Sequence, residues 1–223
     1  MKVAFYYAKA GNGFTDDSGY VELAENMIQS AQVFSYQVVQ LTDKKTKALT
    51  KTVKRFDIHP LLCSWNSLYV YYKYVHEYLD EDTVFLDSDT LVLRSLDSVF
   101  EEEFDVGLTW RDFNPPYNSG AIYVKPGKGA RWFFTEALKQ TLSIPTHKRQ
   151  WGVDQPAYWS VVGTKAPGSY TLGQMKLRVF PCSTHNYSPS SFDEKPKDQF
   201  IWHLKGRRKA YTIGEGKLYQ EID

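Results

Sequence analysis

The stretch "TVFLDSDTLVL", residues 83–93, places two carboxylates, Asp87 and Asp89, directly after a run of apolar residues. The apolar run has the composition of a buried β-strand. In an extended chain, residues two apart point the same way, so both carboxylates would project from one face at the carboxyl end of the strand. Open α/β sheets bind their ligands at that edge. The stretch therefore predicts a strand that ends in a polar site.

Two explanations fit this pair of aspartates. Neighbouring carboxylates repel each other, and a divalent cation that prefers oxygen ligands, Mg²⁺ or Mn²⁺, would stabilise the arrangement. Alternatively, the Asp-Ser-Asp tripeptide caps the element that follows, because Asp and Ser side chains satisfy free backbone N–H groups. The tripeptide alone does not decide between them, so the surrounding sequence has to.

The residues before the aspartates alternate between strand and helix patterns. β-branched and aromatic runs indicate strands, and apolar residues at helical spacing indicate helices. The predicted elements are strands at 2–7, 36–41 and 83–86 and helices at 20–34 and 64–79. This order is typical of a parallel sheet. The lysine-rich segment 43–55 is predicted to be a solvated loop or an exposed helix, with an anion-binding patch as the alternative.

After the aspartates the same kinds of pattern continue. The predicted elements are strands at 105–110, 119–124 and 176–181, helices at 129–142 and 154–162, and a loop at 111–118 that contains Pro-Pro. There is no internal repeat and no linker-like stretch. We therefore predict one domain over residues 1–223, of the α/β class, with a Rossmann-like mixed, mostly parallel sheet flanked by helices.

Composition limits the classes of function. The 223 residues are 42% hydrophobic, which is enough for a substantial core, and 27 basic residues nearly balance 26 acidic ones. This charge balance argues against nucleic acid as the main partner. No apolar run approaches the roughly 18 residues of a membrane span, and the N-terminus does not read as a signal peptide. The two cysteines, Cys63 and Cys182, fit no metal-binding spacing, so we predict a cytoplasmic protein without a transmembrane segment.

Five stretches carry a family resemblance. They are "VFLDSDTLVLRSLDSVF" (84–100), "YNSGAIYVK" (117–125), "WGVDQPAYW" (151–159), "VFPCSTHNY" (179–187) and "HLKGRRKAY" (203–211). In this order they resemble the motifs of retaining nucleotide-sugar glycosyltransferases of the glycogenin and bacterial lipopolysaccharide galactosyltransferase type, glycosyltransferase family 8. The resemblance implies a GT-A type fold and a nucleoside diphosphate sugar as donor.

The resemblance also implies a metal site. Asp87 and Asp89 would hold the ion, with Asp89 the closer ligand and Asp87 also near the ribose. His203 matches the third protein ligand and begins the motif H-x-x-G-x-x-K. A histidine nitrogen beside carboxylates shifts the metal preference from Mg²⁺ towards Mn²⁺. His185 is a rival ligand, and for either histidine the alternative is a hydrogen-bonded surface residue.

Four residues match positions that surround the donor sugar. Asn118 and Ser119 match residues that contact the sugar. Asp154 and Gln155 match a pair beside the sugar ring, where the aspartate holds hydroxyls and the glutamine amide lies near the reacting carbon. Asp154 also fits as a helix-capping residue, and the two roles are compatible.

Two further residues match the family's phosphate-binding positions, and a third, Lys73, matches another donor-binding position. Gly206 would let the backbone approach the diphosphate, and Lys209 falls where a lysine contacts the departing phosphate. The family usually continues with Pro-Trp, whereas this chain has Ala210 and Tyr211. Lys73 matches a basic residue on the helix before the aspartates, although it fits equally as an exposed side chain among tyrosines.

The N-terminal region departs from the family. An acidic residue and a tyrosine usually hold the uracil base after the first strand, but Lys9 stands where the acid is expected here. Asp16, Asp17 and Tyr20 are the candidates for that role, so UDP remains the predicted nucleotide. Acceptor contacts lie on variable loops, so the sequence predicts no particular acceptor.

The implied chemistry is the transfer of a sugar from its diphosphate. Cleaving this bond requires the growing charge on the leaving group to be neutralised, which a divalent metal and Lys209 would do. We predict front-face attack by the acceptor, because the sequence positions no second carboxylate and Gln155 is a poor nucleophile. Two other classes stay open. They are a nucleotide-sugar-binding protein without transfer activity, and a nucleotidyltransferase, which would need a basic glycine-rich loop that is missing after the first strand.

Overall fold

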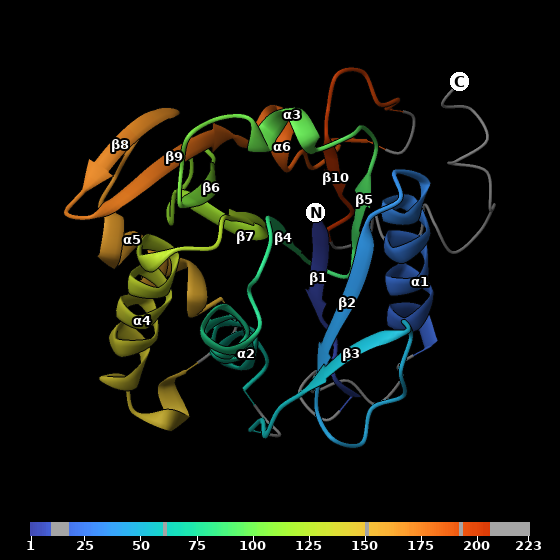
Figure 1. Ribbon diagram of the computed structural model, residues 1–223, viewed down its shortest axis with the longest axis horizontal. Coiled ribbons are helices and arrows are strands. Elements are labelled where there is room, and N and C mark those ends of the chain that lie inside the picture. The colour runs from blue at the N-terminus through green and yellow to red at the C-terminus, as the bar shows by residue number, and fades with distance from the viewer. Residues whose placement is uncertain (10–17, 60–61, 150–151, 192–193, 206–223) are drawn as a thin grey trace.

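The computed structural model of the chain describes residues 1–9, 18–59, 62–149, 152–191 and 194–205 (Figure 1). The strands are β1 (Lys2–Tyr6), β2 (Gln37–Thr42), β3 (Thr52–Arg55), β4 (Thr83–Leu86), β5 (Thr90–Val92), β6 (Val106–Trp110), β7 (Tyr117–Val124), β8 (Gly168–Leu172), β9 (Met175–Pro181) and β10 (Ile201–His203). The helices are α1 (Ser18–Val33), α2 (Cys63–Glu77), α3 (Asp97–Phe100), α4 (Lys128–Leu142), α5 (Asp154–Val162) and α6 (Cys182–His185), with a 3₁₀ turn at Thr146–Lys148.

Eight strands form one mixed sheet in the order β3-β2-β1-β4-β7-β6-β9-β8. Strands β3, β2, β1 and β4 are parallel neighbours, and β6 is parallel to β9. Strands β7 and β8 run against their neighbours. The predicted α/β class, with a mixed and mostly parallel sheet flanked by helices, is therefore confirmed.

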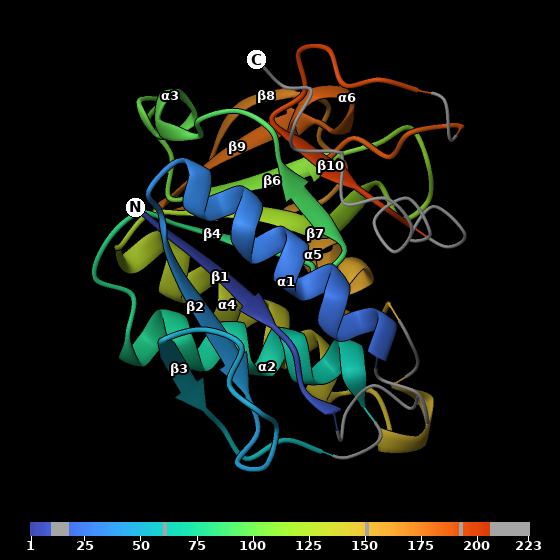
Figure 2. The ribbon, with the colours of Figure 1, turned by 90° about the vertical axis from the view of Figure 1, so that its right-hand side faces the viewer.

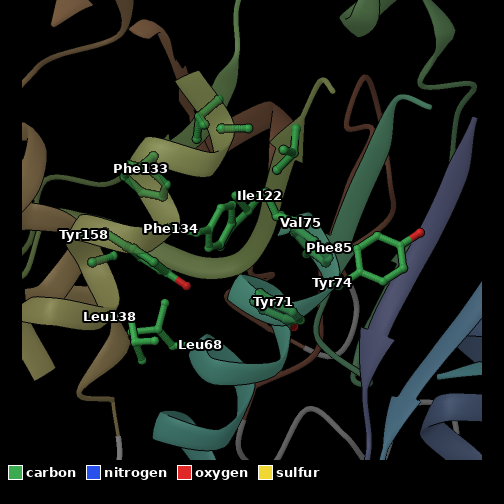
Figure 3. Close-up of a cluster of buried hydrophobic side chains, with 14 of the residues drawn as sticks. Leu68, Tyr71, Tyr74, Val75, Phe85, Ile122, Phe133, Phe134, Leu138 and Tyr158 are labelled. Atoms are coloured by element: carbon green, nitrogen blue, oxygen red, sulfur yellow. The ribbon is translucent and has the colours of Figure 1, made fainter. Parts of the chain in front are cut away.

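Helices cover both faces of this sheet, and β4 contributes side chains to the hydrophobic core on each face. Helices α2, α4 and α5 pack on one face, while α1 and α3 pack on the other (Figure 2). Side chains alternate along a strand, so Phe85 points into the first core, and Val84 and Leu86 point into the second. Phe85 stacks on Tyr71 with ring centroids 4.3 Å apart and meets Phe134 edge-on at 5.7 Å (Figure 3). Because β4 is buried on both sides, its carboxyl end is held rigidly.

A second, two-stranded sheet lies beside α1. It pairs β5 with β10 in antiparallel register, and Figure 1 shows the two strands next to each other. Ser30 of α1 fastens it, since its hydroxyl accepts the backbone N–H of Val92 at 3.0 Å and donates to the Met27 carbonyl at 2.7 Å. The short strand that follows the two aspartates is thus tied to the main body of the molecule.

The structure corrects one prediction within the segment 43–55. Its last residues form the edge strand β3, parallel to β2, rather than a loop or helix. The Arg55 guanidinium closes the preceding loop by donating to the carbonyls of Asp43 at 2.6 Å and Thr46 at 3.0 Å. An edge strand needs little apolar content, so its composition resembled that of a loop. In the part of the chain described above, no helix is long and apolar enough to cross a membrane.

Candidate functional site

The two aspartates lie on a tight turn at the carboxyl end of β4. The strand ends at Leu86, and Thr90 closes the turn by donating its backbone N–H at 3.2 Å and its hydroxyl at 2.8 Å to the Asp87 carbonyl. The expectation that both residues are extended was therefore wrong, because the chain turns between them. Both carboxylates nevertheless face the same side chain, that of His203.

The pairing of β5 with β10 brings His203 to this turn. His203 is opposite Thr90 in the register, and the next residue, Leu204, donates its N–H to the Asp89 carbonyl at 2.8 Å. The His203 Nε2 atom lies 3.2 Å from Asp89 Oδ1 and 3.4 Å from Asp87 Oδ2. Side-chain exposure is 3% for His203, 12% for Asp89 and 40% for Asp87, so the group opens to solvent on the Asp87 side.

Hydrogen bonds behind His203 determine which of its nitrogens faces the aspartates. The Thr109 hydroxyl donates its one proton to the Asn118 carbonyl at 2.9 Å and accepts the Asn186 amide at 3.0 Å. The Asn186 oxygen is then left to accept from His203 Nδ1, 2.9 Å away. Nδ1 therefore carries a proton, and Nε2 is the nitrogen that faces the two carboxylates. In the neutral imidazole this arrangement leaves Nε2 available as a metal ligand.

A glycine gives the imidazole its room. The His203 ring packs directly on Gly120 of β7, and a methyl group on Gly120 would overlap the ring atoms Cε1 and Nδ1. The carbonyl of Gly120 also accepts the backbone N–H of Asp87 at 3.0 Å. One residue thus contacts both sides of the candidate metal site.

The three side chains fit a divalent cation. Ligand atoms of Asp87, Asp89 and His203 all lie within 4.8 Å of one another. Adjacent ligands around an octahedral ion at about 2.1 Å are separated by about 3 Å, which is close to the two nitrogen–oxygen distances given above. Two carboxylates and one imidazole suit Mn²⁺ better than Mg²⁺ and leave other coordination positions open.

A bulge in β7 presents the next pair of residues. The register between β6 and β7 shifts after Leu108, so that Thr109 pairs with Asn118 and the intervening residues of β7 bulge. Asn118 is buried and its side-chain oxygen accepts the N–H of Gly120 at 3.0 Å, while Ser119 is nearly buried beside it. Both predicted donor-sugar residues therefore directly precede the glycine that supports His203.

Helix α5 adds Asp154 and Gln155. Asp154 is the first residue of the helix and not its cap, which is Val153. Its carboxylate accepts hydrogen bonds from the Ser119 hydroxyl and from backbone N–H groups of its own turn. The Gln155 amide nitrogen lies 3.4 Å from Ser119 Oγ. Ser119, Asp154 and Gln155 thus form one connected polar group.

Asp154 is the titratable residue of this group. Burial raises the pKa of its carboxyl to about 6, and the nearby Asp87 charge acts in the same direction. The hydrogen bond from Ser119 acts against both. At neutral pH Asp154 is therefore mainly ionised, and its hydrogen-bonded oxygens suit it to holding hydroxyl groups.

The structure adds residues that sequence reasoning missed. Arg111 Nη2 donates to Gln155 Oε1 at 2.7 Å, and Asn186 orients His203 as described above. Lys205 lies close enough to Asp87 and Arg111 for their charges to affect its pKa, which burial lowers. Arg111 follows a strand and Lys205 lies inside the H-x-x-G motif, so both positions were visible as polar residues near predicted site elements. The contacts that these two residues make depend on tertiary structure and could not be predicted from the sequence.

Other predicted residues are not brought into this group. Lys73 lies on α2 and forms an ion pair with Glu77, and none of its described contacts reaches the aspartates, so the geometry gives its donor-binding role no support. His185 stacks on Phe180 with ring centroids 4.4 Å apart, and its Nδ1 lies 2.7 Å from the Thr184 hydroxyl, so it is not the rival ligand.

The remaining predicted residues divide into two sets. Tyr20 packs against the core on the α1 side of the sheet, and the backbone N–H of Lys9 donates to the Thr46 hydroxyl at 2.9 Å. The positions Asp16, Asp17, Gly206 and Lys209 lie outside the described residues.

A pocket of about 390 Å³ lies elsewhere in the molecule. It is lined by the first residues of β1, β2 and β3, Lys2, Gln37 and Thr52, together with the end of α2. Strands β1 and β4 are parallel, so this pocket is at the opposite edge of the sheet from Asp87. It has no part in the site described above.

Comparison with known proteins supports the fold. A glycosyltransferase involved in the glycosylation of the major capsid of PBCV-1 superposes with a TM-score of 0.61 at 13% identity, over 96% of this chain and 100% of that one. The galactosyltransferase LgtC, in complex with donor and acceptor sugar analogues, gives 0.58 at 12% identity, over 98% and 96%. Mouse xyloside xylosyltransferase 1 gives 0.56 at 10% identity, over 91% and 97%.

No protein-family profile and no curated protein sequence matches the chain. The likeness is thus one of structure, and it extends over nearly the whole of the three glycosyltransferases named above. It bears out the GT-A type fold that the motifs implied. This chain has the fold of glycosyltransferases of the GT-A type.

Proposed function

We propose that this protein is a metal-dependent glycosyltransferase that moves a sugar from a nucleoside diphosphate sugar, with UDP as the nucleotide, to an acceptor. The observation that carries this proposal is the convergence of Asp87, Asp89 and His203 at the carboxyl edge of the sheet. These three side chains would hold a divalent metal that neutralises charge on the diphosphate, and Mn²⁺ is the ion we propose. We further propose that the chain acts as one domain.

The residues of this chain would divide the work of transfer. Asp154 would hold sugar hydroxyls through a carboxylate that Ser119 and the start of α5 keep in place. Gln155 would lie at the reacting carbon, because its amide is fixed between Arg111 and Ser119. The metal would supply charge stabilisation for the departing diphosphate. From the motif, Gly206 and Lys209 would contact the same phosphates.

We propose that transfer occurs with retention, by attack of the acceptor on the face that the diphosphate leaves. Asp154 accepts several hydrogen bonds, which makes it a poor nucleophile. The Gln155 oxygen accepts from Arg111, which likewise lowers its nucleophilicity. Positioning of donor and acceptor would then supply most of the rate enhancement.

The first experiment measures nucleotide and metal binding together. The thermal midpoint is recorded with UDP, GDP, ADP or CMP, each with and without Mn²⁺. A ligand at about a hundred times its dissociation constant adds roughly 2.7 kcal/mol to the free energy of unfolding. We expect stabilisation by UDP with Mn²⁺, and its loss in Asp87→Ala and Asp89→Ala. Asp80→Ala is the matched control, because Asp80 pairs with Lys2 at the opposite edge of the sheet.

The second experiment separates transfer from binding. Release of UDP from a panel of UDP-sugars is measured with Mn²⁺ and again after chelation. Turnover that disappears on chelation supports the transferase, whereas UDP binding without release from any donor supports a binding protein. Cleavage of a nucleotide sugar by pyrophosphate, to give a nucleoside triphosphate and a sugar 1-phosphate, would instead identify a nucleotidyltransferase and contradict the proposal.

A further inference from the structure

The pocket of about 390 Å³ at the opposite edge of the sheet is lined mainly by charged and polar side chains. Its floor is the face of the sheet on which α2 packs, over the first residues of β1, β2 and β3. Helix α2 ends at Glu77, and the pocket opens beside that end. Its volume lies within the range of roughly 300–1,000 Å³ that is typical of small-molecule sites.

The acidic side chains of this pocket already have partners. Among the described residues that line it, the acids are Glu77 and Asp80. Asp80 Oδ1 lies 2.5 Å from Lys2 Nζ, which also lies 3.1 Å from the Glu81 carboxylate. Glu77 forms an ion pair with Lys73 of its own helix. Neither acid is therefore available to neutralise a further cation in the pocket.

Two cations in the same lining have no such partner. Lys54 on β3 and Arg131 on α4 form no ion pair, and their side chains donate no hydrogen bond, to any residue that the structure describes. The Lys54 ammonium lies over the Tyr78 ring, 4.2 Å from its centroid, which holds the ammonium in place but cancels no charge. Like charges in one pocket repel, and a bound anion removes that repulsion. Lys54 belongs to the lysine-rich segment 43–55, for which an anion-binding patch was one of the expectations.

The floor of the pocket also offers groups that bind hydroxyls. The Gln37 amide nitrogen donates to the Thr52 hydroxyl at 3.2 Å. The Gln37 amide oxygen and the Thr52 hydroxyl hydrogen have no other partner in the described part of the chain, so both remain for a ligand. A molecule that carries one anionic group and several hydroxyls would therefore satisfy the two cations and the two polar side chains together.

We propose that this pocket binds a sugar that carries a phosphate or carboxylate group, with Lys54 and Arg131 holding the anionic group and Gln37 and Thr52 the hydroxyls. Strands β1 and β4 are parallel, so the pocket and the carboxylate of Asp87 are at opposite edges of the sheet. The sugar-anion site is thus separate from the candidate metal site and does not depend on the proposed transfer.

A purely structural role is the competing explanation for the two cations. The end of α2 lies beside the pocket, and the partial negative charge at a helix C-terminus attracts cations. In that case Lys54→Met and Arg131→Met would lower the free energy of unfolding and leave the affinity for anions unchanged. Binding measurements therefore distinguish the two explanations.

The test compares four probes that differ in charge and in hydroxyl groups: D-glucose, D-glucuronate, D-glucose 6-phosphate and inorganic phosphate. Their dissociation constants for the full chain are measured by titration calorimetry without metal or nucleotide. We expect at least one sugar anion to bind at least tenfold more tightly than glucose and than inorganic phosphate. With UDP and Mn²⁺ added, the affinity for that sugar anion should stay within twofold.

Variants then assign this binding to the pocket. Lys54→Met and Arg131→Met keep an apolar side chain and remove the charge, and each should weaken binding of the sugar anion at least tenfold. Lys51→Met is the matched control, because Lys51 belongs to the same lysine-rich segment but is exposed and does not line the pocket. Its affinity should stay within twofold of the parent protein. Circular dichroism checks that each variant folds.

Four results would overturn the inference. They are equal affinity of the parent protein for glucose and both sugar anions, inorganic phosphate binding as tightly as the sugar anions, unchanged affinity in either variant, and binding that UDP with Mn²⁺ weakens tenfold, which would place the anion at the candidate metal site. If UDP fails to bind with Mn²⁺ while the sugar anion still binds, the proposed function fails and the sugar-anion site remains.

Discussion

At the scale of single residues, Gly120 determines whether the three candidate metal ligands can meet. Replacing it with alanine would place a methyl group on the ring of His203, which is buried and cannot retreat. The Asn186 oxygen lies 3.2 Å from the same position, so the hydrogen bond that orients the ring would also be disturbed. Disturbing such an outer partner of a metal ligand lowers metal affinity by about 10–100-fold.

We therefore expect Gly120→Ala to bind Mn²⁺ at least tenfold more weakly than the parent protein, as measured by calorimetric titration. Gly127→Ala is the control, because an added methyl group there meets only the Asp105 side chain, at 3.3 Å. Unchanged Mn²⁺ affinity in a folded Gly120→Ala protein would show that His203 is not a ligand.

Asp154 makes stability depend on pH. Its pKa is raised from 3.8 to about 6 by burial, so between these pH values the folded state binds more protons than the unfolded state. The free energy of unfolding should then fall as pH rises through this window, by up to about 3 kcal/mol. Asp154→Asn keeps the shape without the charge, so its stability relative to the parent should rise from pH 4 to pH 6 and level off above.

Chemical denaturation at several pH values, with chelator present, measures this difference. Asp80→Asn is a control with the opposite pH dependence. The Lys2 hydrogen bond lowers the pKa of Asp80, so the small contribution of Asp80 to stability is lost as pH falls. A parent-to-variant difference for Asp154→Asn that stays constant with pH would contradict the expected burial of the charge.

At the scale of elements, local sequence predicted the long and buried segments and missed the short ones. The strand 83–86 and the helix 154–162 were predicted with the bounds observed, because apolar content and flanking turn residues agree there. Strand β10 has only three residues, and it is extended because it pairs with β5, which local sequence does not reveal. The closeness of Arg111 to Gln155 likewise depends on how β6 and α5 pack, which no local pattern encodes.

A hydrogen bond ties the small sheet that carries His203 to α1. Ser30 is buried, and Ser30→Ala would leave the backbone N–H of Val92 without a partner. An unsatisfied buried group costs about 1–3 kcal/mol of stability. We expect this loss in urea denaturation, together with weaker Mn²⁺ binding as β5 and β10 loosen.

Ser143→Ala is the matched control for this variant. Ser143 makes the same kind of bond to a carbonyl in its own helix, that of Gln140, but it is exposed and holds no other element. Its loss should change stability by less than about 0.5 kcal/mol. Equal effects of the two variants would mean that α1 does not support the small sheet.

At the scale of the whole molecule, the sheet joins two halves of different character. Strands β1 to β4 are parallel to one another, and the strands beyond β7 form the mixed half. The aspartates leave β4 at the boundary, while Asn118 and Ser119 come from β7 beside it. The candidate site therefore exists only if both halves stay joined along β4 and β7.

Phe85 is the residue of β4 that best tests this coupling. It contacts rings from α2 and from α4, so Phe85→Leu should lower the free energy of unfolding by about 1–3 kcal/mol. One cooperative domain predicts that tryptophan fluorescence and far-ultraviolet circular dichroism report the same lowered midpoint. Phe113→Ala is the control, since Phe113 is 68% exposed and its removal should leave the midpoint unchanged. Two separate transitions would mean that the halves fold independently, and the site would then be an interface between them.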